Sequence, residues 1–109
     1  MKKIIVKDLI KSGSATSPEK AKPLYDILVK SVDNKEKVLV DFSNLTTITT
    51  AFFNSSIGKL YSKYSPDTLN EFITLDGKTL TKLQFDKLKL VMQNAKSKLS
   101  ENDIQEEID

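Results

Sequence analysis

Three short apolar segments alternate along this chain with three longer segments whose apolar residues recur at helical spacing. The strands are predicted at residues 3–9, 37–42 and 72–75. The helices are predicted at 18–32, from 49 or 50 to 64, and at 81–99. Strands that alternate with helices favour a mainly parallel sheet with helices packed on it. The sequence therefore predicts a single α/β domain of order βαβαβα, since 109 residues suffice for one hydrophobic core but not two.

The ends of these segments carry recognisable signals. Ser17 followed by Pro18 predicts a helix start, because Ser can cap the first turn and Pro at the first helical position costs no hydrogen bond. Pro66 predicts a helix end, because Pro disfavours a helical residue before it. Residues 38–40 form a continuous apolar run, which is typical of a strand covered on both faces. The expected buried face of the last helix consists of Phe85, Leu88, Met92, Ala95 and Leu99.

The C-terminal residues differ in charge from the rest of the chain. Residues 101–109 carry five acidic side chains and no basic one. Such a segment either frays or extends the last helix as an acidic end. We therefore assign residues 1–100 to the domain and residues 101–109 to an acidic C-terminal tail.

The composition argues against several kinds of chemistry. All 17 basic residues are Lys, and the chain has no Arg, His, Cys or Trp. Zinc and most transition-metal sites therefore lack their usual ligands, a general-base histidine is missing, and no guanidinium can clamp a phosphate. We expect a protein that is not an enzyme and that holds no metal or cofactor. The net charge of only +2 argues against duplex DNA as a partner.

The same composition predicts a cytoplasmic protein. The absence of Cys suits a reducing compartment. The apolar run at residues 4–6 is too short for a signal peptide, and no stretch approaches the roughly 20 apolar residues of a membrane span. We therefore expect no membrane association. The use of Lys without Arg, together with frequent Asn, is typical of an AT-rich bacterial genome.

Asp41 follows the most apolar predicted strand, at the end where open α/β sheets commonly place functional residues. It could supply an acid for a docking or phosphate site. The alternative is an Asp that fixes the loop by accepting backbone N–H groups, which is the more frequent role of Asp in turns.

Four threonines crowd the loop that follows, at Thr46, Thr47, Thr49 and Thr50. A phosphate or a partner at a helix N-terminus would meet free N–H groups and a favourable dipole. The alternative is that Thr49 or Thr50 caps the helix and that the others pack as β-branched residues.

The helix after this loop begins with two adjacent aromatic residues, Phe52 and Phe53. Because neighbours on a helix point in different directions, one of them could be exposed as an anchor for a partner. The alternative is that a sheet edge or a neighbouring helix covers both rings. Asn54 and the two serines after it form a polar run, which is either a surface read by a partner or the ordinary solvated face.

The segment at residues 38–53 resembles the centre of STAS domains, the fold of bacterial anti-sigma factor antagonists. In that family an apolar strand ends in Asp-Leu-Ser, and Asp-Ser-Ser-Gly follows at the start of a helix. Here Asp41-Phe42-Ser43 matches the first part, and residues 49–52 occupy the second position. The segment is more similar to the STAS-like family of unknown function, and six residues fit its pattern. They are Asp41, Phe42, Leu45, Ile48, Thr49 and Phe52.

The resemblance implies a role but also marks a departure. The serine that is phosphorylated in the antagonists falls on Ala51, which has no hydroxyl group. Thr50 lies beside it and is the candidate phosphorylation site. The later segments at residues 75–77 and 92–96 are also similar to the STAS-like family.

We therefore predict a non-enzymatic regulatory module that docks to another protein. The resemblance implies a partner of the kind that antagonists bind, an ATP-binding kinase of the histidine-kinase superfold. The candidate partner-binding residues are Asp41, Thr47, Thr49, Thr50, Phe52 and Asn54.

Two other functions remain open. The first alternative is a nucleotide or small-ligand sensor with its site at Asp41 and the following helix N-terminus. Nucleic-acid binding through Lys78, Lys82, Lys87 and Lys89 is ranked third, because no aromatic residues interleave with those lysines on one face.

Overall fold

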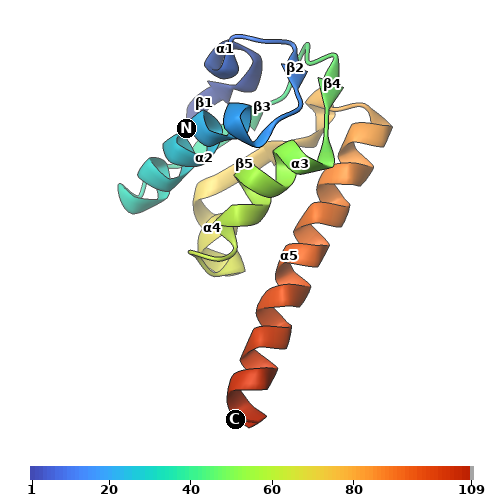
Figure 1. The fold of residues 1–109 in the computed structure, drawn as a ribbon. Coiled ribbons are helices and arrows are strands. Elements are labelled where there is room, and N and C mark those ends of the chain that lie inside the picture. The colour runs from blue at the N-terminus through green and yellow to red at the C-terminus, as the bar shows by residue number, and fades with distance from the viewer. Residues whose placement is uncertain (109) are drawn as a thin grey trace.

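A three-stranded parallel sheet of order β1-β3-β5 organises the structure, a computed structural model that describes residues 1–108 and the side chains of residues 1–96 (Figure 1). The strands are β1 (Lys2–Ile5), β3 (Val38–Asp41) and β5 (Ile73–Asp76). Ile4 pairs with Val40, and Val40 pairs with Leu75 on the other side. Val38 and Val40 of the central strand are fully buried. The predicted mainly parallel sheet is therefore confirmed.

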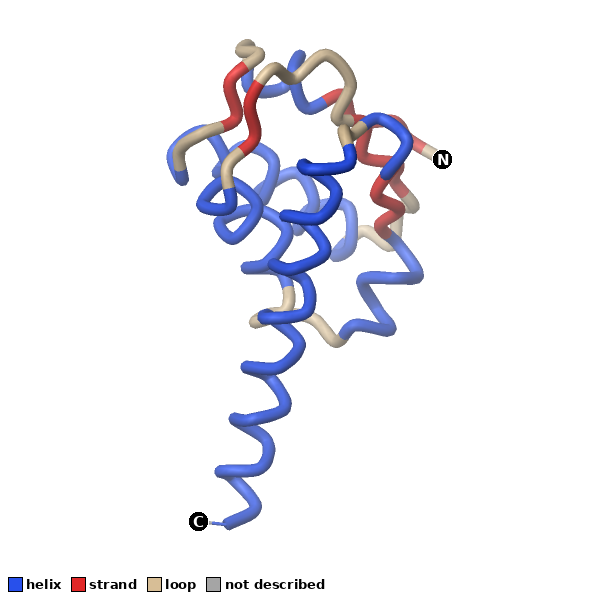
Figure 2. Tube along the Cα trace, turned by 90° about the vertical axis from the view of Figure 1, so that its right-hand side faces the viewer, coloured by secondary structure: helices blue, strands red, loops and turns tan. Residues whose placement is uncertain are grey.

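Helical segments make up most of the remaining structure. They are α1 (Val6–Ile10), α2 (Pro18–Asp33), α3 (Thr50–Phe53), the π-helical segment η1 (Asn54–Gly58), α4 (Pro66–Phe72), the 3₁₀ turn η2 (Gly77–Thr79) and α5 (Lys82–Ile108). The helix formed by α3 and η1 packs against both α2 and α5. Helix α5 then continues away from the other elements to the C-terminus (Figures 1 and 2).

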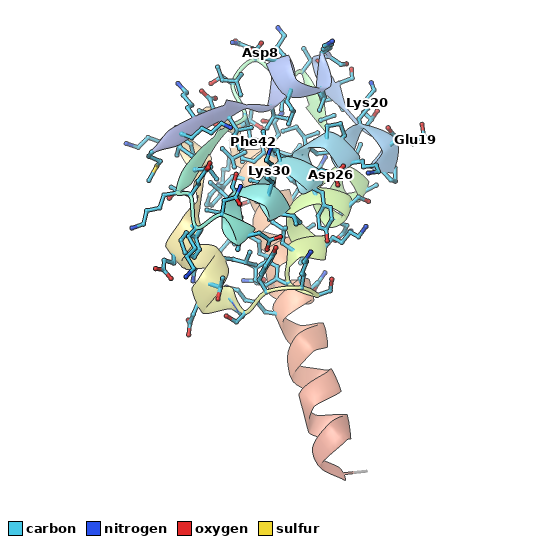
Figure 3. All side chains as sticks on the ribbon, turned by 90° about the vertical axis from the view of Figure 1, so that its left-hand side faces the viewer. Asp8, Glu19, Lys20, Asp26, Lys30 and Phe42 are labelled. Atoms are coloured by element: carbon cyan, nitrogen blue, oxygen red, sulfur yellow. The ribbon has the colours of Figure 1, made fainter. Side chains whose placement is uncertain are left out.

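The start of α2 is as predicted. Ser17 Oγ accepts a hydrogen bond from the Lys20 backbone N–H at 3.2 Å, and Pro18 occupies the first turn. Leu24 and Leu28 are fully buried on the inner face of this helix. Figure 3 views α2 from outside, where Asp26 and Lys30 point into solvent.

Two short helices correct the predicted boundaries. The first strand ends at Ile5 because α1 begins at Val6, which is fully buried, with Leu9 and Ile10 packed on the core beside it. The prediction of strand to residue 9 is therefore wrong. The helix predicted to continue to residue 64 ends at Leu60, and Pro66 instead starts another helix, α4, where Ser65 Oγ accepts from the Thr68 N–H at 3.2 Å.

A second, two-stranded parallel sheet forms between two segments for which no strand was predicted, residues 14–15 and residues 47–48. Its strands are β2 (Ser14–Ala15) and β4 (Thr47–Ile48). Figure 2 shows this pair apart from the main sheet, with helical segments between them. Ala15 and Ile48 point into the core, so this small sheet closes one end of the hydrophobic interior.

The buried face of α5 also differs in part from the prediction. Leu88 is 2% exposed and Val91, which was not predicted, is 1% exposed, whereas Phe85 is 42% exposed. Met92 and Ala95 are half-buried, and Leu99 lies outside the described side chains, as do the charges of the predicted acidic tail. Within residues 1–108, no helix combines the length and apolar character needed to cross a membrane.

Candidate functional site

Asp41 lies at the end of β3 and is 6% exposed. Its Oδ1 accepts a hydrogen bond from the Ser43 backbone N–H at 2.7 Å, and its Oδ2 lies 3.2 Å from Lys3 Nζ. Hydrogen bonding by Ser43, with a smaller contribution from Lys3, holds the pKa of the Asp41 carboxyl below its usual range. Both carboxylate oxygens are therefore engaged within the fold. This geometry matches the loop-fixing role of Asp41 and leaves little support for a ligand-sensing site at this residue.

We expect Asp41→Asn to lower the free energy of unfolding at pH 7 by about 1–2 kcal/mol, because a charged hydrogen bond is replaced by a neutral one. A depressed pKa in the folded state stabilises the fold above the unfolded-state pKa, and this contribution is lost as pH falls through the folded-state pKa. The difference between wild type and variant should therefore shrink in acid. Urea unfolding at pH 7 and at pH 3 measures this, with the exposed Asp86→Asn as control. An equal deficit at both pH values would contradict this role of the charge.

The four threonines of the following loop fall into two pairs. Thr46 Oγ1 donates to the Gly13 carbonyl at 3.0 Å, and Thr49 Oγ1 donates to the Thr16 carbonyl at 3.0 Å. Thr49 Oγ1 also accepts from the Phe52 N–H at 3.2 Å and so caps α3, as one of the two interpretations predicted. Thr47 and Thr50 are exposed, and their side chains make no hydrogen bond within the described residues. Thr46 and Thr49 thus hold the loop, while Thr47 and Thr50 face solvent.

Phe52 and Phe53 are both fully buried, so the interpretation of one exposed aromatic anchor is wrong, and the alternative, that neighbouring elements cover both rings, is confirmed. The Phe53 ring lies 5.9 Å from the Phe42 ring and 6.4 Å from the Phe52 ring, with both pairs edge to face. Two adjacent residues can both be buried here because α2 and α5 cover the helix from two directions. Phe52 is therefore part of the core and not of a surface that a partner could contact.

The polar run after Phe53 is divided between surface and interior. Ser56 is fully buried, and its Oγ donates to the Phe52 carbonyl at 2.8 Å. Asn54 is exposed and Ser55 is half-exposed. Thr50 and Asn54 lie four residues apart on a continuous helix and therefore share one side of it. We call the outward-facing set Thr47, Thr50, Asn54 and Ser55 the exposed polar face.

The helix turn that carries part of this face is a π-helical segment, at Asn54–Gly58. Such segments are rare in proteins, and those that do occur are often found at functional sites. The segment is also closely packed, because a Cβ at Gly58 would lie 3.1 Å from Val91 Cγ1 of α5. The helix that carries part of the exposed polar face is therefore held in position by its close packing against α5.

The sequence profile of the STAS-like domain of unknown function (DUF4325) matches residues 20–79, which is more than half of the chain. The chain belongs to this family. The family that residues 41–52 predicted is therefore confirmed. No curated protein and no solved structure matches the chain.

The matched part of this STAS-like domain contains the complete exposed polar face. It extends from α2 to η2 and so includes β3, Asp41 and the threonine loop. Strand β1, strand β2 and helix α5 lie outside it. The matched residues and the candidate residues are thus in the same segment, whereas α5 lies outside the match.

A hollow beside the exposed polar face was missed by sequence reasoning. It has a volume of about 240 Å³ and lies between the start of α2 and η1. Within it, Lys22 Nζ pairs with Asp26 Oδ2 at 2.8 Å, and Lys59 Nζ lies 4.6 Å from the centroid of the Tyr25 ring. Ser55 contributes to both the hollow and the exposed polar face. The Lys22–Asp26 spacing was readable from the sequence, but its position next to residues 55–59 depends on tertiary packing.

Proposed function

We propose that this STAS-like domain is a non-enzymatic regulatory module that docks to another protein through the exposed polar face. The observation that carries the proposal is the division of the threonine loop. Two threonines are used to fix the backbone, while the side chains of Thr47, Thr50 and Asn54 are exposed and make no hydrogen bond within the described residues. Exposed polar side chains on a fixed backbone favour recognition, because little conformational entropy is lost on binding.

Rigidity beneath the face supports this role. The loop is held by the hydrogen bond from the Thr49 N–H to the Ala15 carbonyl at 3.0 Å, in addition to the bonds of Thr46 and Thr49 side chains. Phe52 and Phe53 of the helix that follows are fully buried, and the buried Phe42 ring packs edge to face against Phe53. A partner would therefore meet a preformed surface, as in most pre-organised complexes.

The hollow beside the exposed polar face indicates which chemical group a partner would place there. Lys59 is exposed, and its ammonium group lies over the Tyr25 ring and pairs with no carboxylate within the described residues, whereas Lys22 is already paired with Asp26. A carboxylate of the partner could pair with Lys59 while neighbouring polar groups meet Asn54 and Ser55. The first class of partner to test is the ATP-binding kinases of the histidine-kinase superfold, which the resemblance to anti-sigma factor antagonists implies.

We expect the triple variant Thr47→Ala, Thr50→Ala, Asn54→Ala to lose its partner. Three interface side chains at about 1 kcal/mol each would weaken binding about 100-fold. The measurement is affinity capture from a lysate of the source organism with wild-type and variant chains, followed by titration of the captured protein. The matched control is Asn34→Ala, Gln93→Ala, Asn94→Ala, which removes three exposed amides elsewhere on the surface.

The outcomes of this experiment separate docking from phosphorylation. If the wild type and both triple variants bound the captured protein equally, the proposal that the exposed polar face is the docking surface would be refuted. Intact-mass measurement of the captured chain in the presence of ATP tests the switch, and one added phosphate on Thr50 would support it. A specific partner with an unmodified chain would keep the docking role and remove the phosphate switch.

A further inference from the structure

An apolar groove lies on a different part of the molecule, where α5 passes α4 and β5. Its volume is about 440 Å³, and its lining residues come from four elements and the turn after η1. Leu69 and Asn70 come from α4, Ile73 to Leu75 from β5, and Phe85 to Met92 from α5. This volume lies within the range of about 300–1,000 Å³ that is usual for small-molecule sites.

Phe85 shows why the groove exists. The helical spacing predicted that this side chain belongs to the core, yet it is 42% exposed and forms one wall of the groove. A Cβ at Gly77 would lie 2.8 Å from Phe85 Cε2, so the ring packs directly on the backbone of η2. The Phe85 ring is therefore held in place by its contact with Gly77, and it faces the unfilled space between α5 and β5.

The chemistry of the lining is simple. Nine of its twelve residues are apolar or aromatic, and the other three are Asn70, Thr74 and Lys89. Lys89 is the one charged residue in this set, and no acidic residue lines the groove. An apolar body would be favoured by the walls, and a negative charge would be favoured by the ammonium group. A cationic ligand would find no counter-charge there.

We propose that this groove binds a small amphipathic carboxylate, with its hydrocarbon part between α5 and β5 and its carboxylate paired with Lys89. A phosphorylated ligand such as a nucleotide fits the lining less well, because one lysine and two neutral polar groups are few donors for several phosphate oxygens. The site is independent of the exposed polar face, and the inference does not rest on the proposed docking function.

Sodium decanoate, used below its micelle concentration, is the probe, and decanol is its uncharged counterpart. Binding is measured by isothermal titration calorimetry on the full chain. We expect decanoate to bind more tightly than decanol, and Lys89→Glu to weaken decanoate about 10-fold or more, as expected for loss of a charged hydrogen bond. Decanol binding should change little in this variant. Lys82→Glu makes the same charge change on the same helix outside the groove and should leave decanoate binding unchanged.

A second substitution tests the groove itself. Thr74 is exposed and lines the groove, so Thr74→Trp should fill it and abolish binding of both probes while the circular dichroism spectrum stays that of the wild type. The triple variant of the exposed polar face should bind decanoate as the wild type does. No binding of decanoate to the wild type, or an equal loss in Lys82→Glu and Lys89→Glu, would overturn the proposal.

Discussion

Replacing Phe53 with Ala is expected to lower the free energy of unfolding by about 3–5 kcal/mol, which is the usual cost of a large cavity at a buried aromatic residue. Phe53 is fully buried and lies between two other phenylalanine rings, each in edge-to-face contact with it. The substitution removes both contacts at once and leaves a space that the packed helices α2 and α5 cannot easily close. Since domains of this size are stable by about 5–15 kcal/mol, much of the population could unfold near 37 °C.

Urea unfolding followed by circular dichroism measures this effect. The matched control is Phe85→Ala, which removes the same ring from a side chain that is 42% exposed and should cost much less. Equal losses of unfolding free energy in the two variants would contradict the inference that Phe53 and its two neighbouring rings form the centre of this core. The same pair of variants also serves as a control for the docking experiment, because it shows how partner binding changes when the stability of the domain is reduced.

The elements with a strong apolar pattern could be predicted from the sequence, and the elements without one could not. Strand β3 has only four residues but contains a continuous apolar run, and the 16 residues of helix α2 carry a helical stripe. Strands β2 and β4 have two residues each, so no alternation exists to be read. Helix α4 was missed although Ser65-Pro66 repeats the start signal of Ser17-Pro18, because the proline was interpreted only as a helix end.

The candidate site was predictable where a residue acts locally. The roles of Asp41 and Thr49 depend on backbone groups two or three residues away, and both were among the roles considered. The burial of Phe52 depends on helices on both sides of it, which no local pattern contains. The hollow at Lys59 and the groove at Lys89 each join segments far apart in sequence. Such sites become visible only when tertiary packing is known.

The second large effect concerns α5, which lies outside the part of the chain that matches the STAS-like family. We expect Leu88→Ala to lower the free energy of unfolding by about 2–5 kcal/mol, as for other buried leucines. Leu88 is 2% exposed and belongs to the same core cluster as Phe53 and Val40. It also lines the groove, so its loss removes one wall contact as well as a core contact.

Leu90→Ala is the matched control, because Leu90 lies on the same helix, has the same helix propensity and is 54% exposed. We expect it to change stability little. If Leu88→Ala were equally mild, α5 would be an appendage, and the groove beside it would not be a defined site. A large loss for Leu88→Ala alone would show that the family segment and α5 fold as one cooperative unit. The position of α5, and with it the width of the groove, would then be set by the core, so that a carboxylate bound beside Lys89 would stabilise the whole domain.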